Sequence, residues 1–215
     1  MKELYILGAS GHGKVVLDVA KSMKKYKKIR FFDDVAQNVT SQNNITLLIE
    51  GNTEKLIQFA KNNPEAEVII AVGNNRIRKK IQSRMEQENL SVATLVHACA
   101  VVSDEARIGA GTVVMPGAVI NSGAVIGKGC IINTSCSVDH DNWIGDYCHI
   151  SVGSHLAGTV KVGEETFIGA GAVVKNNVDI CERCLIGAGA VVVSNIKVPG
   201  TYMGIPAKLQ KTSME

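Results

Sequence analysis

The residues of this sequence best suited to acid–base chemistry lie in one short acidic stretch. His140 stands between Asp139 and Asp141. Histidine is a common proton acceptor at neutral pH because its ordinary pKa is about 6.5. A neighbouring carboxylate can orient the imidazole and raise its basicity. The stretch therefore indicates a general base with either aspartate as its partner, and a surface histidine among solvated acids is the structural alternative.

A second group of candidate residues surrounds a glycine-rich loop near the start of the chain. The run Gly8-Ala9-Ser10-Gly11-His12-Gly13 separates an apolar segment from one with helical spacing. Backbone N–H groups at such a helix start can receive a phosphate. An acid about 20 residues further on meets a ribose hydroxyl in units of this kind. The ligand contacts that we expect are Ser10, Gly11, His12, Gly13, Asp33, Asp34 and Gly73.

The first part of the chain alternates strands and helices around this loop. Strands are predicted over 4–7, 29–32 and 68–72, and helices over 14–23, 53–63 and 75–89. The order βαβαβα predicts a small parallel sheet in a Rossmann-like α/β domain over 1–94. The loop spacing G-x-x-G-x-G departs from the dinucleotide fingerprint, and a half-sized sheet cannot offer both halves of a dinucleotide site. A single nucleoside diphosphate therefore fits better than NAD.

The second part of the sequence is organised by a repeat of six residues, a hexad. Every sixth residue from Val102 to Val198 is Val or Ile, apart from Leu156. Two positions before each of these stands, in most cases, Ala, Cys, Ser or Thr. One large and one small side chain in every hexad is the packing of a coil with short flat faces. The repeat predicts a solenoid over 95–200, followed by a C-terminal tail over 201–215.

The glycines and cysteines add detail to this coil. Gly109, Gly127, Gly145 and Gly163 recur at every third hexad, which predicts three faces per coil. Four of the six cysteines occupy the small positions of the repeat. We expect these to be buried thiols and neither disulfides nor metal ligands. They are Cys130, Cys136, Cys148 and Cys184.

Composition excludes several classes of function. The 215 residues hold 23 Lys and Arg against 20 Asp and Glu, and the net charge of +3 is too mild for a nucleic-acid or membrane surface. No apolar run approaches the roughly 18 residues that a membrane span needs. The opening residues read as a first strand and not as a signal peptide. Buried thiols suit a reducing compartment, so we expect a cytoplasmic protein.

These motifs together resemble a known family. The resemblance rests on the glycine loop, on Phe32-Asp33-Asp34, on Gly73-Asn74-Asn75-Arg76-Ile77-Arg78 and on the hexapeptide column, and it reaches Gly204-Ile205-Pro206-Ala207-Lys208. The chain resembles the sialic-acid O-acetyltransferase group of hexapeptide-repeat acyltransferases. Within that group it is most similar to bacterial UDP-4-amino-sugar N-acetyltransferases of the bacillosamine or perosamine pathway type. The resemblance implies a left-handed parallel β-helix for the column.

The resemblance also implies substrates and residue roles. It implies acetyl-CoA as cosubstrate, no metal, a nucleotide-sugar acceptor bound by the first domain, and a homotrimer with sites between columns. His140 would be the base and Asp141 its partner, although many relatives carry glutamate at the second position. His149 would contact the thioester of acetyl-CoA. Ala170 and Ala188, three hexads apart, would lie beside its long arm.

Other functions remain open at this point. O-acetylation of sialic acid or a related sugar fits the same family. A metal hydratase like the γ-type carbonic anhydrases would use His140, His149 and His155 as zinc ligands, although their spacing is not that of a strong ligand set. A non-catalytic nucleotide-sugar-binding subunit is compatible with a repeat column. We expect direct attack by the amine, because no histidine is matched to activate Cys99 or Cys181 as a nucleophile.

Overall fold

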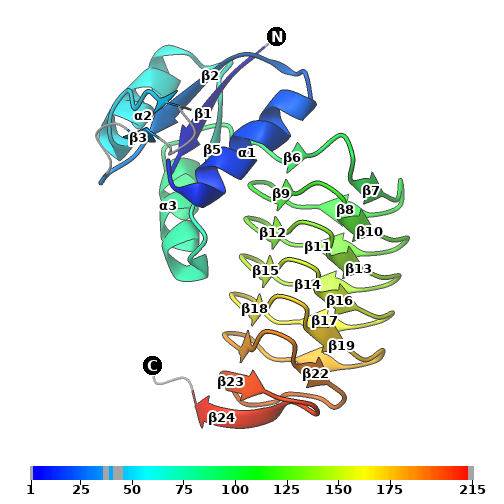
Figure 1. The fold of residues 1–215 in the computed structure, drawn as a ribbon. Coiled ribbons are helices and arrows are strands. Elements are labelled where there is room, and N and C mark those ends of the chain that lie inside the picture. Colours follow the sequence, from blue (N-terminus) through cyan, green and yellow to red (C-terminus); the bar gives the residue numbers. More distant parts are fainter. Residues whose placement is uncertain (1, 36–38, 41–45, 213–215) are drawn as a thin grey trace. The chain divides into compact units, whose positions relative to one another are not determined.

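The computed structural model describes residues 2–35, 39–40 and 46–212. These residues form two compact units, Met1–Ala98 and Cys99–Glu215 (Figure 1). The sequence placed the boundary at residue 94, but the division falls after Ala98. The segment that carries β6 (Leu95–Val96) packs on α1 (Gly11–Ser22), and the Ala98 N–H donates to the Ser22 hydroxyl at 3.1 Å. These contacts attach residues 95–98 to the first unit.

The first unit is a three-stranded parallel sheet with helices on both faces (Figure 1). The strands are parallel, as the βαβαβα pattern predicted, and their order is β2-β1-β5. A short antiparallel pair, β3 and β4, lies between β2 and α2 in sequence. Besides α1 and β6, the elements are β1 (Lys2–Leu7), β2 (Tyr26–Phe32), β3 (Val39–Thr40), β4 (Thr46–Leu47), α2 (Thr53–Asn62), β5 (Glu67–Ile70) and α3 (Asn75–Gln87).

The central strand β1 is apolar on both sides because both of its faces are covered. Tyr5 and Leu7 pack into a core with Leu56 of α2 and Met85 of α3.

The predicted elements are all present, but α1 begins at Gly11 and not at residue 14. The last glycines of the loop therefore belong to the first helical turn, where their N–H groups point along the helix axis.

The second unit is a column of two-residue strands on three faces (Figure 1). One face holds β7, β10, β13, β16, β19 and β22, the next holds β8, β11, β14, β17 and β20, and the third includes β9, β12, β15, β18 and β21. The strands are β7 (Val101–Val102), β8 (Arg107–Ile108), β9 (Val113–Val114), β10 (Val119–Ile120), β11 (Val125–Ile126), β12 (Ile131–Ile132), β13 (Ser137–Val138), β14 (Trp143–Ile144), β15 (His149–Ile150), β16 (His155–Leu156), β17 (Lys161–Val162), β18 (Phe167–Ile168), β19 (Val173–Val174), β20 (Asp179–Ile180), β21 (Leu185–Ile186) and β22 (Val191–Val192).

Each strand of the column pairs in parallel with the strand three hexads away, as the predicted coil length requires. Ile126 of β11, for example, pairs with Ile144 of β14, and Ile144 pairs with Val162 of β17. The three aliphatic side chains of this row are buried, and so are the residues two positions before them, which are Ala124, Asn142 and Val160. The four thiols in the small positions are buried in the same way, at Cys130, Cys136, Cys148 and Cys184.

The repeat ends differently from the sequence prediction. Val198 was expected in the aliphatic row, but it is 49% exposed. Ile180 pairs with Ile196 and not with Val198, so the last coil is shorter than the others and Ile196 takes the buried place. The segment predicted as a tail adds two more strands, the antiparallel pair β23 (Gly200–Met203) and β24 (Lys208–Thr212). This hairpin continues the sheet from β21 and covers its edge.

No helix among the described residues is long and apolar enough to cross a membrane.

Candidate active site

His140 lies at a corner of the column, in the turn between β13 and β14. The side chains of Val138 and Ile144 anchor the turn in the interior. Between them the backbone turns sharply, and Asp141 adopts a left-handed conformation with φ of 58°. The flanking positions are fixed by packing, so the His140 side chain must point outward. Its side chain is 59% exposed.

The imidazole of His140 is held by the carboxylate that follows it. Nδ1 lies 2.9 Å from Oδ2 of Asp141. This hydrogen bond raises the pKa of His140 against an opposing effect of desolvation, and the charges of Asp139 and Asp141 add to the increase. When Nδ1 carries the proton that Asp141 accepts, Nε2 has the free lone pair. The pair can therefore take a proton at Nε2 and stabilise the resulting imidazolium.

Asp139, the other candidate partner, faces different groups. Its Oδ1 accepts hydrogen bonds from the Asn121 amide at 2.8 Å and from the backbone N–H of His140 at 2.7 Å. The bond from Asn121 is the main reason that the pKa of Asp139 is lowered. Asp139 thus shapes the turn, whereas Asp141 contacts the ring.

His149 and His155 lie on other parts of the same column. The His149 ring is half-buried on β15, with Nε2 3.0 Å from the Asn133 amide and its centroid 4.8 Å from that of Phe167. His155 lies on β16, where Nδ1 is 2.9 Å from the Ser137 hydroxyl. The two histidines belong to different sheets. Among the described residues, no group of three or more His, Cys, Asp or Glu side chains is arranged to hold a metal ion.

The two alanines predicted beside the acetyl-CoA arm are stacked and exposed. The N–H of Gly189 donates to the carbonyl of Ala170 at 2.8 Å, which places the Gly187–Gly189 turn directly on the turn of the previous coil. Gly171 and Gly189 both adopt φ of +66°, and a Cβ at either would meet no atom within 4 Å. The stacked turns at Ala170 and Ala188 therefore form an open strip on which backbone is exposed, and an unbranched ligand chain can lie along this strip.

The glycines of the first loop fall into two kinds. Gly8 has φ of +113°, and a Cβ there would lie 2.5 Å from the carbonyl oxygen of Ala71. A Cβ at Gly13 would collide with the Gly8 carbonyl. These two glycines allow the loop to pack against the sheet. A Cβ at Gly11 or Gly73 would meet nothing within 4 Å, so these two positions border open space.

The start of α1 lacks the capping seen at the other two helices. Asn52 caps α2 by accepting from the N–H of Lys55, and Asn74 caps α3 by accepting from the N–H of Ile77. Ser10 occupies the capping position of α1 but makes no side-chain cap bond. The N–H groups of the first turn are consequently available to an anion, and the helix dipole favours one there.

His12 lies half-buried in the first turn of α1, with its Nε2 inside. Burial lowers its pKa to about 4, and the positive charge of Arg78 adds to this effect. Among the described residues its Nε2 has no hydrogen-bond partner, although the atom is buried. Arg78 is itself buried and donates to the carbonyls of Val72 and Gly73 at 3.0 and 3.1 Å. The ring is therefore neutral at physiological pH and, depending on its tautomer, can donate or accept a hydrogen bond at Nε2.

The two aspartates after β2 organise the edge of the sheet. Asp33 accepts from the N–H groups of Ala9 and Val35, both at 2.8 Å. Asp34 accepts from the N–H and the hydroxyl of Thr53, both at 2.7 Å, and so fixes the start of α2. A cavity of about 460 Å³ opens beside them. It is lined by Asp33, Asp34, Val35, Ile49, Gly51, Asn52 and Lys55.

The four cysteines in the small positions of the repeat point into the column. Burial raises the pKa of Cys136 and that of Cys184 to about 12. The thiols of Cys130 and Cys148 point inward and lie 3.2 and 3.1 Å from the carbonyl oxygens of Gly145 and Gly163. Inward-facing thiols of this kind are poorly placed to meet a substrate outside the column.

Sequence reasoning missed several residues that shape these sites. Arg78 belongs to the motif that begins at Gly73, but nothing in its spacing indicates that it is buried and that its charge acts on His12. Asn133 contacts His149 although their separation in sequence is not a multiple of the repeat. Asn121 lies three hexads before Asp139, so the coil length could have identified this contact.

Comparisons with known proteins agree on one group. Residues 3–85 match the PglD N-terminal domain, and residues 143–176 and 159–194 match the bacterial transferase hexapeptide repeats. The UDP-N-acetylbacillosamine N-acetyltransferase of Bacillus subtilis is 35% identical over 115 residues, which is 54% of this chain and about half, 52%, of that protein.

Two solved structures are similar over almost the entire chain. The acetyltransferase domain of PglB from Neisseria gonorrhoeae, in complex with acetyl coenzyme A, is 37% identical with a TM-score of 0.91, covering 97% of this chain and 99% of that one. A variant of the GDP-perosamine N-acetyltransferase from Caulobacter crescentus, in complex with CoA and GDP-perosamine, is 32% identical with a TM-score of 0.89. That similarity covers 98% of this chain and 97% of that one.

Proposed function

Because the chain belongs to the bacillosamine- and perosamine-type N-acetyltransferases, built from a Rossmann-like domain and a left-handed β-helix, we propose that it moves an acetyl group from acetyl-CoA to the amine of a UDP-linked 4-amino sugar. The observation that carries the proposal is the bond between His140 Nδ1 and Asp141 Oδ2, which leaves Nε2 as a proton acceptor at an exposed corner. Amine acylation needs such a base near neutral pH.

The reaction proceeds by direct attack. The lone pair of the sugar nitrogen forms a bond to the thioester carbonyl carbon, and Nε2 of His140 takes the proton that the nitrogen loses. The carbon–sulfur bond then breaks, and the imidazolium returns the proton to the departing CoA sulfur. Asp141 stabilises the imidazolium while it exists. Inward-facing thiols such as Cys130 and Cys148 support a route without an acetyl-enzyme.

The substrates are assigned to the two units separately. The diphosphate of the sugar nucleotide would lie at the uncapped start of α1, where Ser10, Gly11 and Gly13 offer backbone N–H groups and His12 offers its buried Nε2. The nucleoside would occupy the cavity beside Asp33 and Asp34, with Gly73 bordering open space.

Acetyl-CoA would lie along the column, with its arm on the open strip at Ala170 and Ala188 and its thioester near His149. The absence of side chains from Gly171 and Gly189 supports this placement, because a pantetheine chain needs close contact with backbone. No metal takes part in the proposed reaction. The reduced, inward-facing thiols fit a cytoplasmic enzyme.

A homotrimer is the proposed assembly. Several large apolar side chains lie on the outside of the column, among them Trp143 at 49% exposed, Leu185 at 45% and Val193 at 46%. Exposed apolar residues of this size favour contact with another subunit. Light scattering at micromolar concentration should give three times the mass of the chain, and a monomer would count against the assembly.

The acceptor is tested by release of CoA thiol across a panel of UDP-, GDP- and CMP-linked sugars, each with and without a 4-amino group. We expect the highest kcat/KM for a UDP-4-amino sugar. A preference for the GDP-linked amino sugar would change the nucleotide and leave the chemistry as proposed. Exclusive use of sialic acid or its CMP derivative would replace N-acetylation with O-acetylation.

The order of events is tested by initial rates with both substrates varied. Direct transfer in a ternary complex gives intersecting lines in double-reciprocal plots. Parallel lines, or an acetylated cysteine trapped with the sugar nucleotide left out, would contradict direct attack.

A further inference from the structure

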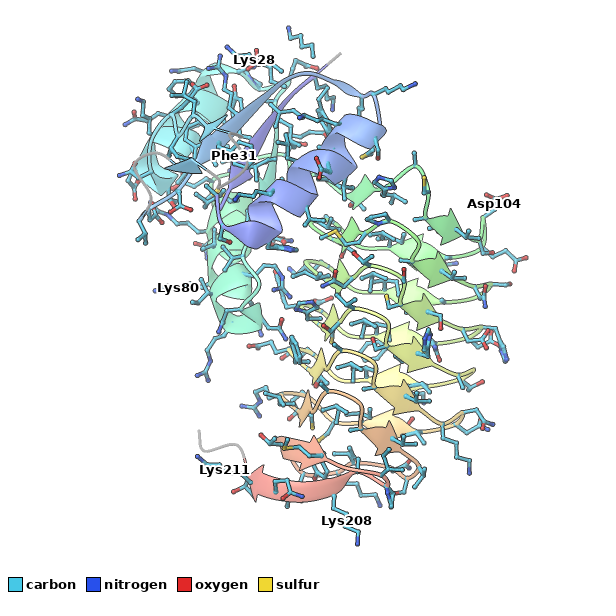
Figure 2. The ribbon with its side chains drawn as sticks, viewed as in Figure 1. Lys28, Phe31, Lys80, Asp104, Lys208 and Lys211 are labelled. Carbon is cyan, nitrogen blue, oxygen red and sulfur yellow. The ribbon has the colours of Figure 1, made fainter. Side chains whose placement is uncertain are left out.

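The corner that carries His140 belongs to a row of equivalent positions, one on each coil. Figure 2 labels Asp104, the first of them. Ser122, His140, Gly158 and Asn176 follow at intervals of three hexads. The turns stack through repeated backbone hydrogen bonds: the N–H of Thr159 donates to the carbonyl of His140 at 2.9 Å, and the N–H of Asn177 donates to that of Gly158 at 3.1 Å. The backbone is therefore similar at each level of the row.

The backbone does not explain why position 158 is glycine. Gly158 is not among the residues with positive φ, and the equivalent positions on neighbouring coils hold serine, histidine and asparagine. What distinguishes Gly158 is the ring that lies against it. A Cβ at this position would lie 2.5 Å from Cε1 of His140 and closer still to Nε2. Real side chains do not approach so closely, so the imidazole would have to leave its place.

A second glycine, Gly123, lies on the preceding coil, next to the carboxylate of Asp141. Gly123 has φ of +71°, but the equivalent position carries Asp141, Thr159 and Asn177 on later coils at φ of 58°, 61° and 58°. Residues with side chains therefore adopt the left-handed backbone conformation at this position of the coil. A Cβ at Gly123 would lie 2.6 Å from Oδ1 of Asp141, which would displace the carboxylate from the ring.

We propose that Gly158 and Gly123 are positioning residues of the acetyl transfer: by lacking side chains on the two flanking coils, they leave one place for the imidazole of His140 and one for the carboxylate of Asp141. The inference rests on His140 as the proposed base. Nε2, the nitrogen that accepts the proton, is the atom that lies over Gly158. A methyl group there would both turn the ring and occupy the space in front of the reacting nitrogen.

The main test is Gly158→Ala, with Asn176→Ala as a control at the next position of the row. Because this row accepts serine and asparagine, the alanine variant should fold with an unchanged circular dichroism spectrum. We expect kcat to fall roughly 10²-fold, within the usual range for losing a general base, while the KM values for both substrates change little. The Asn176→Ala control should keep its kcat within about twofold.

A double-mutant cycle separates positioning from other roles. If Gly158 acts through the imidazole, Gly158→Ala should cost little in the His140→Ala background, less than about twofold. An equal loss in both backgrounds would overturn the inference and leave the base in place. Near-normal turnover of His140→Ala alone would instead remove the proposed base. The two failures are therefore distinguishable.

A measurement independent of activity completes the test. NMR titration of the His140 ring should give a lower pKa in Gly158→Ala, because the ring loses its contact with Asp141. Gly123→Ala should lower the same pKa, whereas Gly117→Ala should not. Gly117 shares the φ of +71° with Gly123 and therefore carries the same backbone strain, but a Cβ there faces Ser135. An unchanged His140 titration in both Gly158→Ala and Gly123→Ala would contradict the proposal.

Discussion

In the first unit, desolvation and the charge of Arg78 lower the pKa of the half-buried His12 to about 4, so its imidazole is neutral near pH 7. On the column, His140 is exposed beside the carboxylate of Asp141, which raises its pKa. The two histidines thus have pKa values shifted in opposite directions from the ordinary value. A buried neutral ring suits recognition of a polar ligand, and an exposed ring with a raised pKa suits proton transfer. The difference supports the proposed roles, in which the first unit recognises the sugar nucleotide and the column carries the base.

The two regions also differ in how they hold their histidines. The loop around His12 depends on contacts between distant segments, such as Arg78 with the end of β5 and Asp33 with the loop backbone. The corner at His140 depends on residues one coil away, among them Gly123 and Gly158. Substitutions in the first region should therefore affect folding and nucleotide binding, and substitutions in the second should affect turnover.

Removal of the His140 imidazole should have the largest effect. We expect His140→Ala to lower kcat by roughly 10²–10⁴-fold, the usual contribution of a general base, with little change in thermal stability because the side chain is exposed. Thiol release at saturating substrates measures the loss. Near-normal turnover would show that the base lies elsewhere.

The burial of His12 should make the first unit sensitive to acid. Its folded pKa of about 4 lies below the ordinary value of 6.5, so the unfolded chain binds the proton more readily. The stability from burying the neutral ring is present above pH 6.5 and is lost, by about 3 kcal/mol, as the pH falls toward 4. Unfolding can be followed at 222 nm, since all helices of the described residues lie in this unit.

The variant His12→Gln should remove this part of the pH dependence. His155→Gln, at an exposed position of the column, should leave it in place. If wild type and His12→Gln lose stability in parallel between pH 6.5 and 4, the ring is not buried in the neutral form and the contrast between the regions fails.

The partner of His140 should be identified by its pH profile. Asp141→Asn removes the hydrogen bond that chiefly raises the pKa of His140, so the acidic limb of the kcat/KM profile should move to lower pH. We expect kcat to fall about tenfold. Asp139→Asn should have a smaller effect on both, because that carboxylate contacts Asn121 and the backbone. A larger shift from Asp139→Asn would reverse the assignment.

The smallest expected effect belongs to His149. Replacing it with alanine should raise the KM for acetyl-CoA about fivefold and change kcat little, since its ring, held by Asn133 and Phe167, is proposed to bind the thioester and not to move the proton. His155→Ala is the matched control on another face. Equal effects of the two variants would mean that His149 has no specific role toward the thioester.

Much of this molecule could be predicted from the sequence because its largest part is periodic. A coil of three hexads, its buried aliphatic row and its buried thiols follow from spacing alone, since each residue packs on its copy one coil away. The same reasoning placed His140 on an outward corner. It failed at Val198, where the chain shortens the last coil and the pairing of Ile180 with Ile196 replaces the expected one.

Only the tertiary structure decided which groups act on the functional side chains. Two aspartates flank His140 in sequence, but the turn at Asp141, with its φ of 58°, brings only the second to Nδ1. Burial of His12 beside Arg78, which is far away in the sequence, follows no spacing rule, because contacts across a sheet depend on which strands become neighbours. The sequence thus determined the repeat and the residue types, and folding determined the pKa shifts of His12 and His140 through burial and the nearest charges.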